Sequence, residues 1–309
     1  VHSLDDAVRD YTALGFTVVP GGEHAGGLSH NALVSFADGS YLELIAFKGG
    51  GVPEDHLFYR PGNPEGLVTY ALLPDDIERT VSEARLRGLD MGAPRPGGRE
   101  RPDGTRIEWK IAEPPSRDLP FLCWDVTPRD LRVPGGSATV HLNGATGLAD
   151  LVVSVGNLGT SEARYEALLG EPPLDDPASD QPGCAAFRLG ESAVLLTPAT
   201  AESGREGPWM LSVMCEPPVP FSVTDLALTH GVRLSFVMSP LPVNSVEAEY
   251  DFVGALRCRQ CGETGAYRVI EQMLLDEPGE MPEDHLMVQC ERCGYEGAAA
   301  FDISSFYGR

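Results

Sequence analysis

Three stretches of the chain space their apolar residues three or four positions apart, as an amphipathic helix does. In the first stretch, Ser3 can cap the helix start, and Asp6 follows three residues later. A glycine closes each stretch, which is typical of helix ends. The predicted helices cover residues 3–14, 75–87 and 160–169, closed by Gly15, Gly88 and Gly170.

Short apolar runs around these helices predict strands. An Asp38-Gly39 pair between two such runs predicts a hairpin turn. The chain therefore repeats a unit of strand, helix and about three strands, roughly 55–65 residues long, three times. The predicted strands cover residues 67–73 and 148–155 before the second and third helices, and 15–20, 30–36 and 40–47 after the first.

The first unit has only Val1 and His2 before its helix, where the other two units have a full strand. A sheet without that strand would have an unpaired edge, which favours aggregation. We therefore expect about seven to ten further residues before Val1, the length of a usual strand.

A turn-and-strand motif occurs twice, as ADGSYLELIAF at 37–47 and PDGTRIEWKIA at 102–112. Each copy places a glutamate, Glu43 or Glu108, in an otherwise apolar strand, four residues after the glycine. Such a carboxylate either contributes to a functional site or lies on a half-exposed strand, where it faces solvent or pairs with an arginine. The third unit has Val194 at the matching position of GESAVLL, so it breaks the pattern.

The tandem βαβββ unit resembles the vicinal oxygen chelate superfamily, which includes glyoxalase I, extradiol dioxygenases and bleomycin-resistance proteins. Within this superfamily, the amino-acid sequence is most similar to the glyoxalase-like domain proteins. The resemblance covers about residues 1–240. It implies an α+β fold in which tandem modules form curled mixed sheets around a cleft. The segments that carry it are LDDAVRDYTALGF, SHNALVSFADGSYLELIAF, LPFLCWDVTPRDLRVP, HLNGATGLADLVVSV and LTHGVRLSF.

The resemblance implies that a glutamate on the last strand of a module can ligate a divalent metal, and it nominates Glu43. Glu108 stands at the same place in the second unit. The usual partner is a histidine on a module's first strand, but no histidine stands near Leu67 or Asp150. His30, which opens the strand before Glu43, is the nominated catalytic partner. A metal held there would act as a Lewis acid in lyase or dioxygenase chemistry.

Several further residues are candidates for binding the substrate. Aromatic and histidine side chains line many small-molecule sites, although they also occur in cores and turns. Arginines gather in PRPGGRERPDGTR at 94–106, a predicted Gly/Pro-rich loop, and in TPRDLRVP, so an anionic ligand is one interpretation and a solvated loop the other. The candidates are Asn31, Trp109, Trp124, Arg129, His141, Asn143 and His230.

The end of the chain contains two CxxC-Gly motifs, separated by residues 262–289. Four thiolates suit tetrahedral zinc and leave no open position, so the pattern predicts a structural zinc ribbon over 249–309, after a linker at 239–250. This segment has five Lys+Arg and twelve Asp+Glu, a net charge of −7, which disfavours nucleic acid as a partner. The predicted ligands are Cys258, Cys261, Cys290 and Cys293.

The whole chain of 309 residues carries a net charge of −23, which argues against nucleic-acid and anionic-membrane partners. No apolar run approaches the roughly 20 residues of a membrane span, and no signal peptide is visible, so a cytoplasmic protein is expected. We expect a small-molecule binding domain with structural zinc and a possible second divalent metal. Enzymatic activity stays open. The alternatives are a metal-free sequestering protein and a zinc-ribbon interaction module on a non-catalytic scaffold, with a protein partner or a homodimer.

Overall fold

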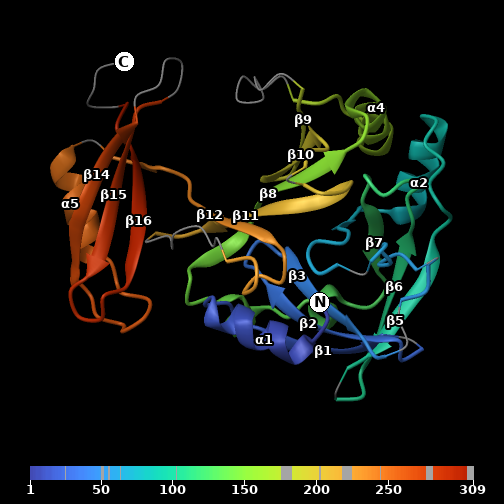
Figure 1. Cartoon of the computed structure of the whole chain (residues 1–309), viewed down its shortest axis with the longest axis horizontal. Helices are drawn as coiled ribbons and strands as arrows, with labels where there is room; N and C mark the ends of the chain where they lie inside the picture. The colour runs from blue at the N-terminus through green and yellow to red at the C-terminus, as the bar shows by residue number, and fades with distance from the viewer. Residues whose placement is uncertain are drawn as a thin grey trace.

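The computed structural model describes residues 1–24, 26–49, 52–54, 56–62, 64–101, 103–174, 183–201, 203–217, 225–243, 245–275 and 281–304. These residues form three mixed sheets with few helices (Figure 1), so the predicted α+β class with curled sheets is confirmed. None of the described helices is long and apolar enough to cross a bilayer.

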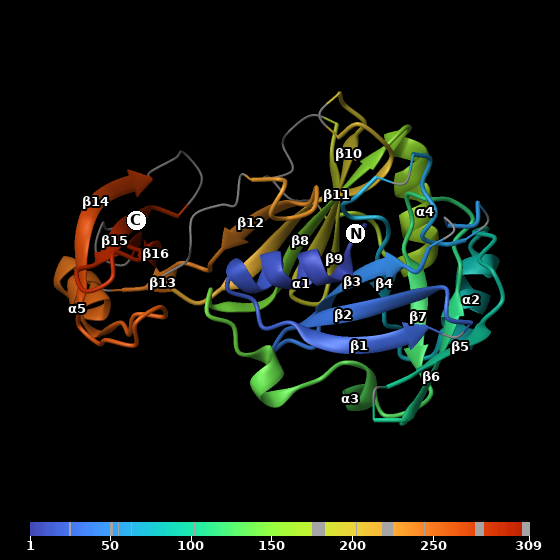
Figure 2. The same cartoon turned by 60° about the horizontal axis from the view of Figure 1, so that its bottom comes forward.

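The first two predicted units build one seven-stranded sheet of order β3-β2-β1-β5-β6-β7-β4. The units join where β1 pairs antiparallel with β5, placing His24 opposite Arg99. The sheet curls so strongly that β1 and β2 cross the direction of β6 and β7 (Figure 2). Its elements are α1 (Leu4–Ala13), β1 (Val19–His24), β2 (Ser29–Ser35), β3 (Tyr41–Phe47), β4 (Ala71–Leu72), α2 (Ile77–Leu86), β5 (Arg95–Glu100), β6 (Arg106–Ala112) and β7 (Phe121–Asp125).

The third unit and the chain after it build a five-stranded sheet of order β12-β11-β8-β10-β9. Two short helices, α3 (Arg129–Arg132) and the 3-10 helix η1 (Gly136–Thr139), connect it to the first sheet. Its elements are β8 (Ala145–Val155), α4 (Leu158–Leu169), β9 (Ala185–Leu189), β10 (Ser192–Pro198), β11 (Gly207–Cys215) and β12 (Arg233–Val237).

The three predicted helices form, and the first is capped by Ser3 as the sequence suggests. The Ser3 hydroxyl accepts a hydrogen bond from the Asp6 N–H at 3.2 Å. Asp76 and Asn157 cap α2 and α4 in the same way. The expected strand 67–73 is shorter, since only β4 forms there.

Two apolar cores join the two large sheets. One packs α2 against α4, with Ile77 and Val81 near Tyr165. The other packs α1 against β2 and β12, with Tyr11, Val34 and Phe236 among its members. Each core therefore combines one module of the first sheet with part of the second.

The two faces of the seven-stranded sheet differ in character. Strand register places the side chains that pack on α1 and α2 on one side, here called the outer face. The opposite side, here called the inner face, carries polar residues in alternation with these, since successive side chains of a strand point to opposite faces. Its polar and aromatic members include His24, Ser29, Asn31, Tyr41, Glu43, Arg99, Trp109 and Asp125.

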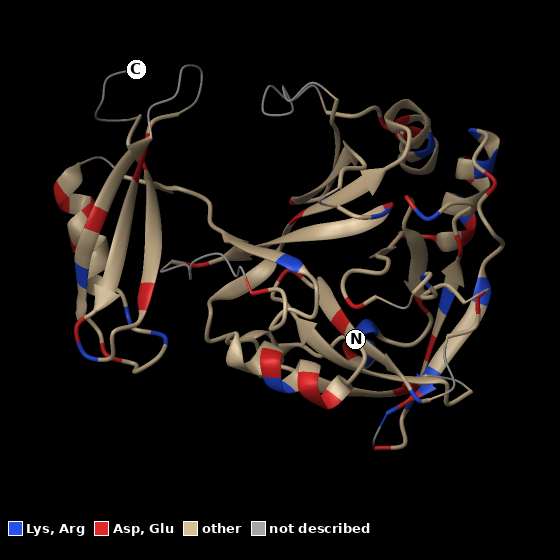
Figure 3. Ribbon diagram, viewed as in Figure 1, with Lys and Arg blue, Asp and Glu red and all other residues tan. Residues whose placement is uncertain are grey.

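The last strands form a four-stranded sheet of order β13-β16-β15-β14, with α5 packed on β14. Acidic residues are visible on its strands and on α1 (Figure 3). The predicted linker 239–250 contains β13 and the start of α5, which Ser245 caps. The elements are β13 (Leu241–Pro242), α5 (Val246–Ala255), β14 (Tyr267–Leu275), β15 (Glu283–Cys290) and β16 (Glu296–Asp302).

One arginine connects this small sheet to the rest of the protein. Arg259, between two of the motif cysteines, donates from Nη2 to the carbonyl oxygen of Glu216 at 3.1 Å. The guanidinium also lies against Gly144, where any side chain would collide with it. Gly144 has a φ of +78°, which likewise favours glycine.

Candidate functional site

Glu43 lies on the inner face at the centre of a hydrogen-bonded group. The Asn31 amide donates from Nδ2 to Glu43 Oε1. His24 Nε2 lies 3.3 Å from the same oxygen, and His24 Nδ1 lies 2.8 Å from the hydroxyl of Ser29. Strand β3 thus supplies a carboxylate that β1 and β2 surround with donors.

These donors determine the charge of Glu43. Burial raises its pKa, but the hydrogen bonds and charge from His24, together with the Asn31 hydrogen bond and the charge of Arg132, outweigh burial. The pKa of Glu43 therefore lies below its ordinary value, and the side chain is a carboxylate at neutral pH.

Arginines gather beside this carboxylate. Arg99 on β5 is 4% exposed and donates to the backbone oxygen of Gly21. Arg132, 7% exposed, pairs with Asp125 and donates to the Tyr41 hydroxyl at 2.6 Å. Arg129 also pairs with Asp125, at 3.0 Å. Asp125 therefore neutralises two of the arginines, whereas Arg99 relies on backbone oxygens.

Two adjacent glycines in β1 make this packing possible. A side chain at Gly21 would overlap the amide of Asn31, and one at Gly22 would lie 2.6 Å from the Glu100 carbonyl. The register of β1 with β2 shifts at this point, so Gly21 bulges between Pro20 and Gly22. The bulge lets Asn31 and Arg99 approach the backbone of β1.

The structure does not bring His30 next to Glu43, as the sequence predicted, because the two side chains lie on opposite faces of the sheet. His30 follows Ser29 and precedes Asn31 on β2, so it points to the outer face. His24, at the end of β1, takes the place beside Glu43.

Glu108 does not share the setting of Glu43 despite the repeated motif. Glu43 lies on the third strand after α1, whereas Glu108 lies on β6, the second strand after α2. Its side chain faces outward, is 47% exposed and pairs with Arg106 at 2.8 Å. Val194 on β10 is buried in the core near α4.

The two predicted tryptophans of this sheet also separate. Trp109 lies on the inner face, with its ring edge-on to His24 at 6.5 Å between centroids. Trp124 lies on the outer face, where its indole N–H donates to the Asp75 carbonyl and Lys110 lies over its ring. Trp109 is therefore the tryptophan placed near Glu43.

His141 and Asn143 are buried in structural roles. His141 Nδ1 accepts from the Thr17 N–H at 3.0 Å, and its ring packs edge-on against Phe16 and Phe36. Asn143 donates to the Leu14 carbonyl at 3.0 Å. Both residues attach the start of β8 to the first module.

His230 lies between two carboxylates. Its Nδ1 is 3.0 Å from Glu65 and its Nε2 is 3.2 Å from Asp10. Its φ of +52° is the only positive value at a non-glycine residue among those described. It joins α1 to the chain before β12 and does not contact Glu43.

The sequence reasoning missed His24, Ser29, Tyr41 and Arg99 as site residues. The sequence predicts a Gly/Pro-rich loop at 94–106 around Arg99, whereas Arg95–Glu100 forms strand β5. The signal that could have found them is the Gly21-Gly22 pair directly before Glu23 and His24, because adjacent glycines within a strand mark a bulge or a close approach.

Two surface cavities lie away from this group, near α2. Their volumes are about 320 Å³ and about 550 Å³. Neither is lined by Glu43, His24 or Arg99. The inner-face group is therefore separate from both cavities.

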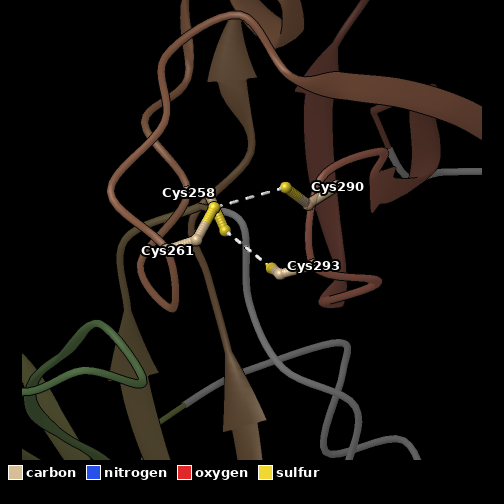
Figure 4. Close-up of side chains that lie close together, drawn as sticks. All are labelled: Cys258, Cys261, Cys290 and Cys293. Atoms are coloured by element: carbon tan, nitrogen blue, oxygen red, sulfur yellow. Dashed lines mark hydrogen bonds between the residues drawn. The ribbon is translucent and has the colours of Figure 1, made fainter.

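The four motif cysteines converge from the two ends of the β14–β15 hairpin (Figure 4). Cys258 and Cys293 have their sulfurs 3.6 Å apart, and Cys261 and Cys290 have theirs 3.7 Å apart. Zinc–sulfur bonds of about 2.3 Å at tetrahedral angles require a sulfur separation of about 3.8 Å. The arrangement therefore fits a tetrahedral metal ion.

The two turns that carry these cysteines are built alike. The N–H of Gly262 donates to the Cys258 carbonyl, and that of Gly294 to the Cys290 carbonyl, both at 2.8 Å. Burial opposes ionisation of Cys258, but turn N–H groups and the Tyr267 hydroxyl lower its pKa to about 6, whereas the neighbouring thiols raise the pKa values of Cys261 and Cys293. A thiolate is the form that binds a metal.

Among the described residues, these cysteines are the one group of three or more metal-ligating side chains close enough to share an ion. Within the described part of the chain, Glu43 and His24 form a pair of metal-ligating side chains with no third close enough to share an ion.

Residues 1–169 match the glyoxalase-like domain family. This span is more than half of the chain. The chain belongs to the glyoxalase-like domain family. No curated protein matched the chain.

Among solved structures, this glyoxalase-like protein is similar to a hypothetical protein from Staphylococcus aureus, at 12% identity and a TM-score of 0.62. That match covers 77% of this chain and 96% of the other. A xylose isomerase-like TIM barrel/4-hydroxyphenylpyruvate dioxygenase fusion protein also matches, at 12% identity and a TM-score of 0.46, over 100% of this chain and 48% of the other. At such identities, the likeness to the first protein shows the fold alone.

Proposed function

We propose that this glyoxalase-like protein binds a small anionic molecule on the inner face of its seven-stranded sheet. The observation that carries this proposal is the buried guanidinium of Arg99. No carboxylate oxygen of the described residues lies within 4.0 Å of it. Arg99 has the charge of Glu43 nearby but makes no direct ion pair, and a buried charge is costly without a directly bonded counter-ion, so a ligand anion would complete the site.

Asn31 supports the same location. It is 4% exposed, and its Oδ1 has no hydrogen-bond donor among the described residues. Buried polar atoms are normally paired, so this oxygen is suited to accept from a ligand or a water. Trp109 adds an apolar wall of the kind common in ligand sites.

The pair of Glu43 and His24 supplies the acid–base chemistry of the proposed site. Glu43 is ionised at neutral pH and can accept a proton from a bound ligand. His24, held by Ser29 on its other nitrogen, can stabilise the charge of Glu43 or relay that proton.

Metal-assisted lyase or dioxygenase chemistry is the second candidate, because Glu43 and His24 are both metal-ligand types and lie 3.3 Å apart. The described residues supply these two ligands and no third. Binding without a metal is therefore the better-supported function of the inner face.

We also propose that the four-cysteine site holds zinc in a structural role. Four thiolates at these separations suit zinc and leave no position open for a substrate. The small sheet has its own core around Val253, Leu286 and Phe301, and metal binding would add to its folding energy.

Metal analysis of the purified protein separates these functions. We expect one zinc per chain, lost in a variant with all four cysteines replaced by serine and retained in Glu43→Ala. A second divalent ion that disappears in Glu43→Ala would instead support the metal-assisted enzyme.

A ligand screen tests the inner face directly. Thermal shift and turnover assays compare three compound classes: small carboxylates, catechols, and α-ketoaldehydes conjugated to thiols. An anionic ligand should bind less tightly to Arg99→Gln, which removes the buried guanidinium, while Arg106→Gln, an exposed arginine on the outer face, should behave as the parent. Equal binding by both variants would contradict the proposed site.

A further inference from the structure

Three arginines from separate segments converge on the chain between β3 and β4. Arg60 lies in this connection, Arg117 precedes β7 and Arg205 precedes β11. Arg60 and Arg117 donate to one shared acceptor, the carbonyl oxygen of Tyr59. Arg60 and Arg205 donate to the neighbouring carbonyls of residues 68 and 67. These shared and adjacent acceptors bring the three guanidinium groups together.

This arginine group has no matching negative charge. No carboxylate oxygen of the described residues lies within 4.0 Å of any of its three guanidinium groups. The chain has 46 acidic and 23 basic residues, so the absence of a carboxylate beside these three arginines does not reflect a shortage of acidic side chains. Burial, together with the charges of Arg117 and Arg205, lowers the pKa of Arg60 to about 10. Arg60 therefore keeps its positive charge at neutral pH.

Unused donors remain in the arginine group. Arg60 is 6% exposed, and its buried Nε has no acceptor among the described residues. Arg117 and Arg205 each use one terminal nitrogen in a hydrogen bond, out of five N–H donors per guanidinium. Arg117 is exposed and Arg205 is half-buried, so a molecule from solvent can reach both.

We propose that Arg60, Arg117 and Arg205 form a binding site for an oxyanion, the phosphate or carboxylate group of a small molecule. Guanidinium groups bind such anions through paired, charge-assisted hydrogen bonds. The three chain segments are far apart in sequence, so the site exists only in the folded protein. It uses none of the residues around Glu43 and does not depend on the function proposed for the inner face.

The test uses the full chain, with inorganic phosphate and acetate as probes against sodium chloride at equal ionic strength. Calorimetric titration should show one of the two anions binding, and the better binder identifies the anion class. In Arg117→Gln/Arg205→Gln this binding should weaken at least about tenfold, since two of the three guanidinium groups that make charge-assisted hydrogen bonds to the anion are removed. A control with the same charge change, Arg79→Gln/Arg106→Gln, removes two exposed arginines and should bind as the parent does.

Circular dichroism and thermal unfolding in chloride establish that each variant is folded. If the double variant is unfolded, Arg117→Gln alone gives the answer, because this exposed side chain makes one described hydrogen bond. Neither anion binding above the chloride control would overturn the proposal. So would undiminished binding in the folded Arg117 and Arg205 variants, and loss of binding in Arg99→Gln alone would assign the anion to the inner face instead.

Discussion

A buried pair of acids in the small sheet leads to a sharp prediction about stability. Glu249 on α5 is fully buried, and Asp284 on β15 is 3% exposed. Neither oxygen of Glu249 has a hydrogen-bond donor among the described residues. Burial and the charge of Asp284 raise the pKa of Glu249 to about 7. Replacing Glu249 with Gln keeps the shape, removes the charge and adds an N–H donor that can face Asp284.

The sign of the effect follows from the raised pKa. Folding favours the protonated form of Glu249, so its contribution to stability is intact below the unfolded-state value of 4.5 and is lost as the pH rises through about 7. Each pKa unit corresponds to about 1.4 kcal/mol. Glu249→Gln should therefore stabilise the small sheet by about 1 kcal/mol at pH 5 and about 3 kcal/mol at pH 8.

Hydrogen–deuterium exchange of peptides from α5 and β15 measures this difference. Parent and variant are compared at the same pH, so that the intrinsic exchange rates cancel. Glu247→Gln, an exposed acid on the same helix, is the matched control and should change protection little at either pH. A gain that is equal at pH 5 and pH 8, or no gain at pH 8, would refute the reasoning.

Three further changes have defined outcomes. Gly21→Ala should push the Asn31 amide away from Glu43 and lower the free energy of unfolding by about 1–3 kcal/mol in chemical denaturation, and an unchanged stability would contradict the overlap described above. Cys258→Ser should remove the metal by elemental analysis and expose β15 to hydrogen exchange, whereas retained metal would show that three cysteines suffice. Ser3→Ala should cost about 1 kcal/mol in thermal or denaturant unfolding through loss of the helix cap, and no change would mean that the Asp6 N–H is equally well bonded to water.

The helices and the cysteine site were predictable because their signals are local. A cap residue, a 3.6-residue period and a closing glycine all lie within one helix, and α1 begins and ends where they indicate. The CxxC-Gly motifs likewise contain their own turn geometry.

The environment of Glu43 was not predictable, since it depends on pairing between strands. Glu43 and Glu108 follow the same turn motif, yet they lie on different strands of their modules and on opposite faces of one sheet. Face assignment changes with a one-residue shift in register, and the Gly21 bulge is such a shift. No pattern within a single strand contains that information.

The position of Arg259 has a consequence for the protein as a whole. It lies between Cys258 and Cys261, so the turn that would bind the proposed zinc ion also contacts the residue after β11, Glu216. Loss of the ion would free that turn, and the small sheet would then be tethered to the glyoxalase-like domain mainly by the chain that joins β12 to β13. If zinc binds there as proposed, we expect its removal to loosen the contact between the small sheet and the end of β11.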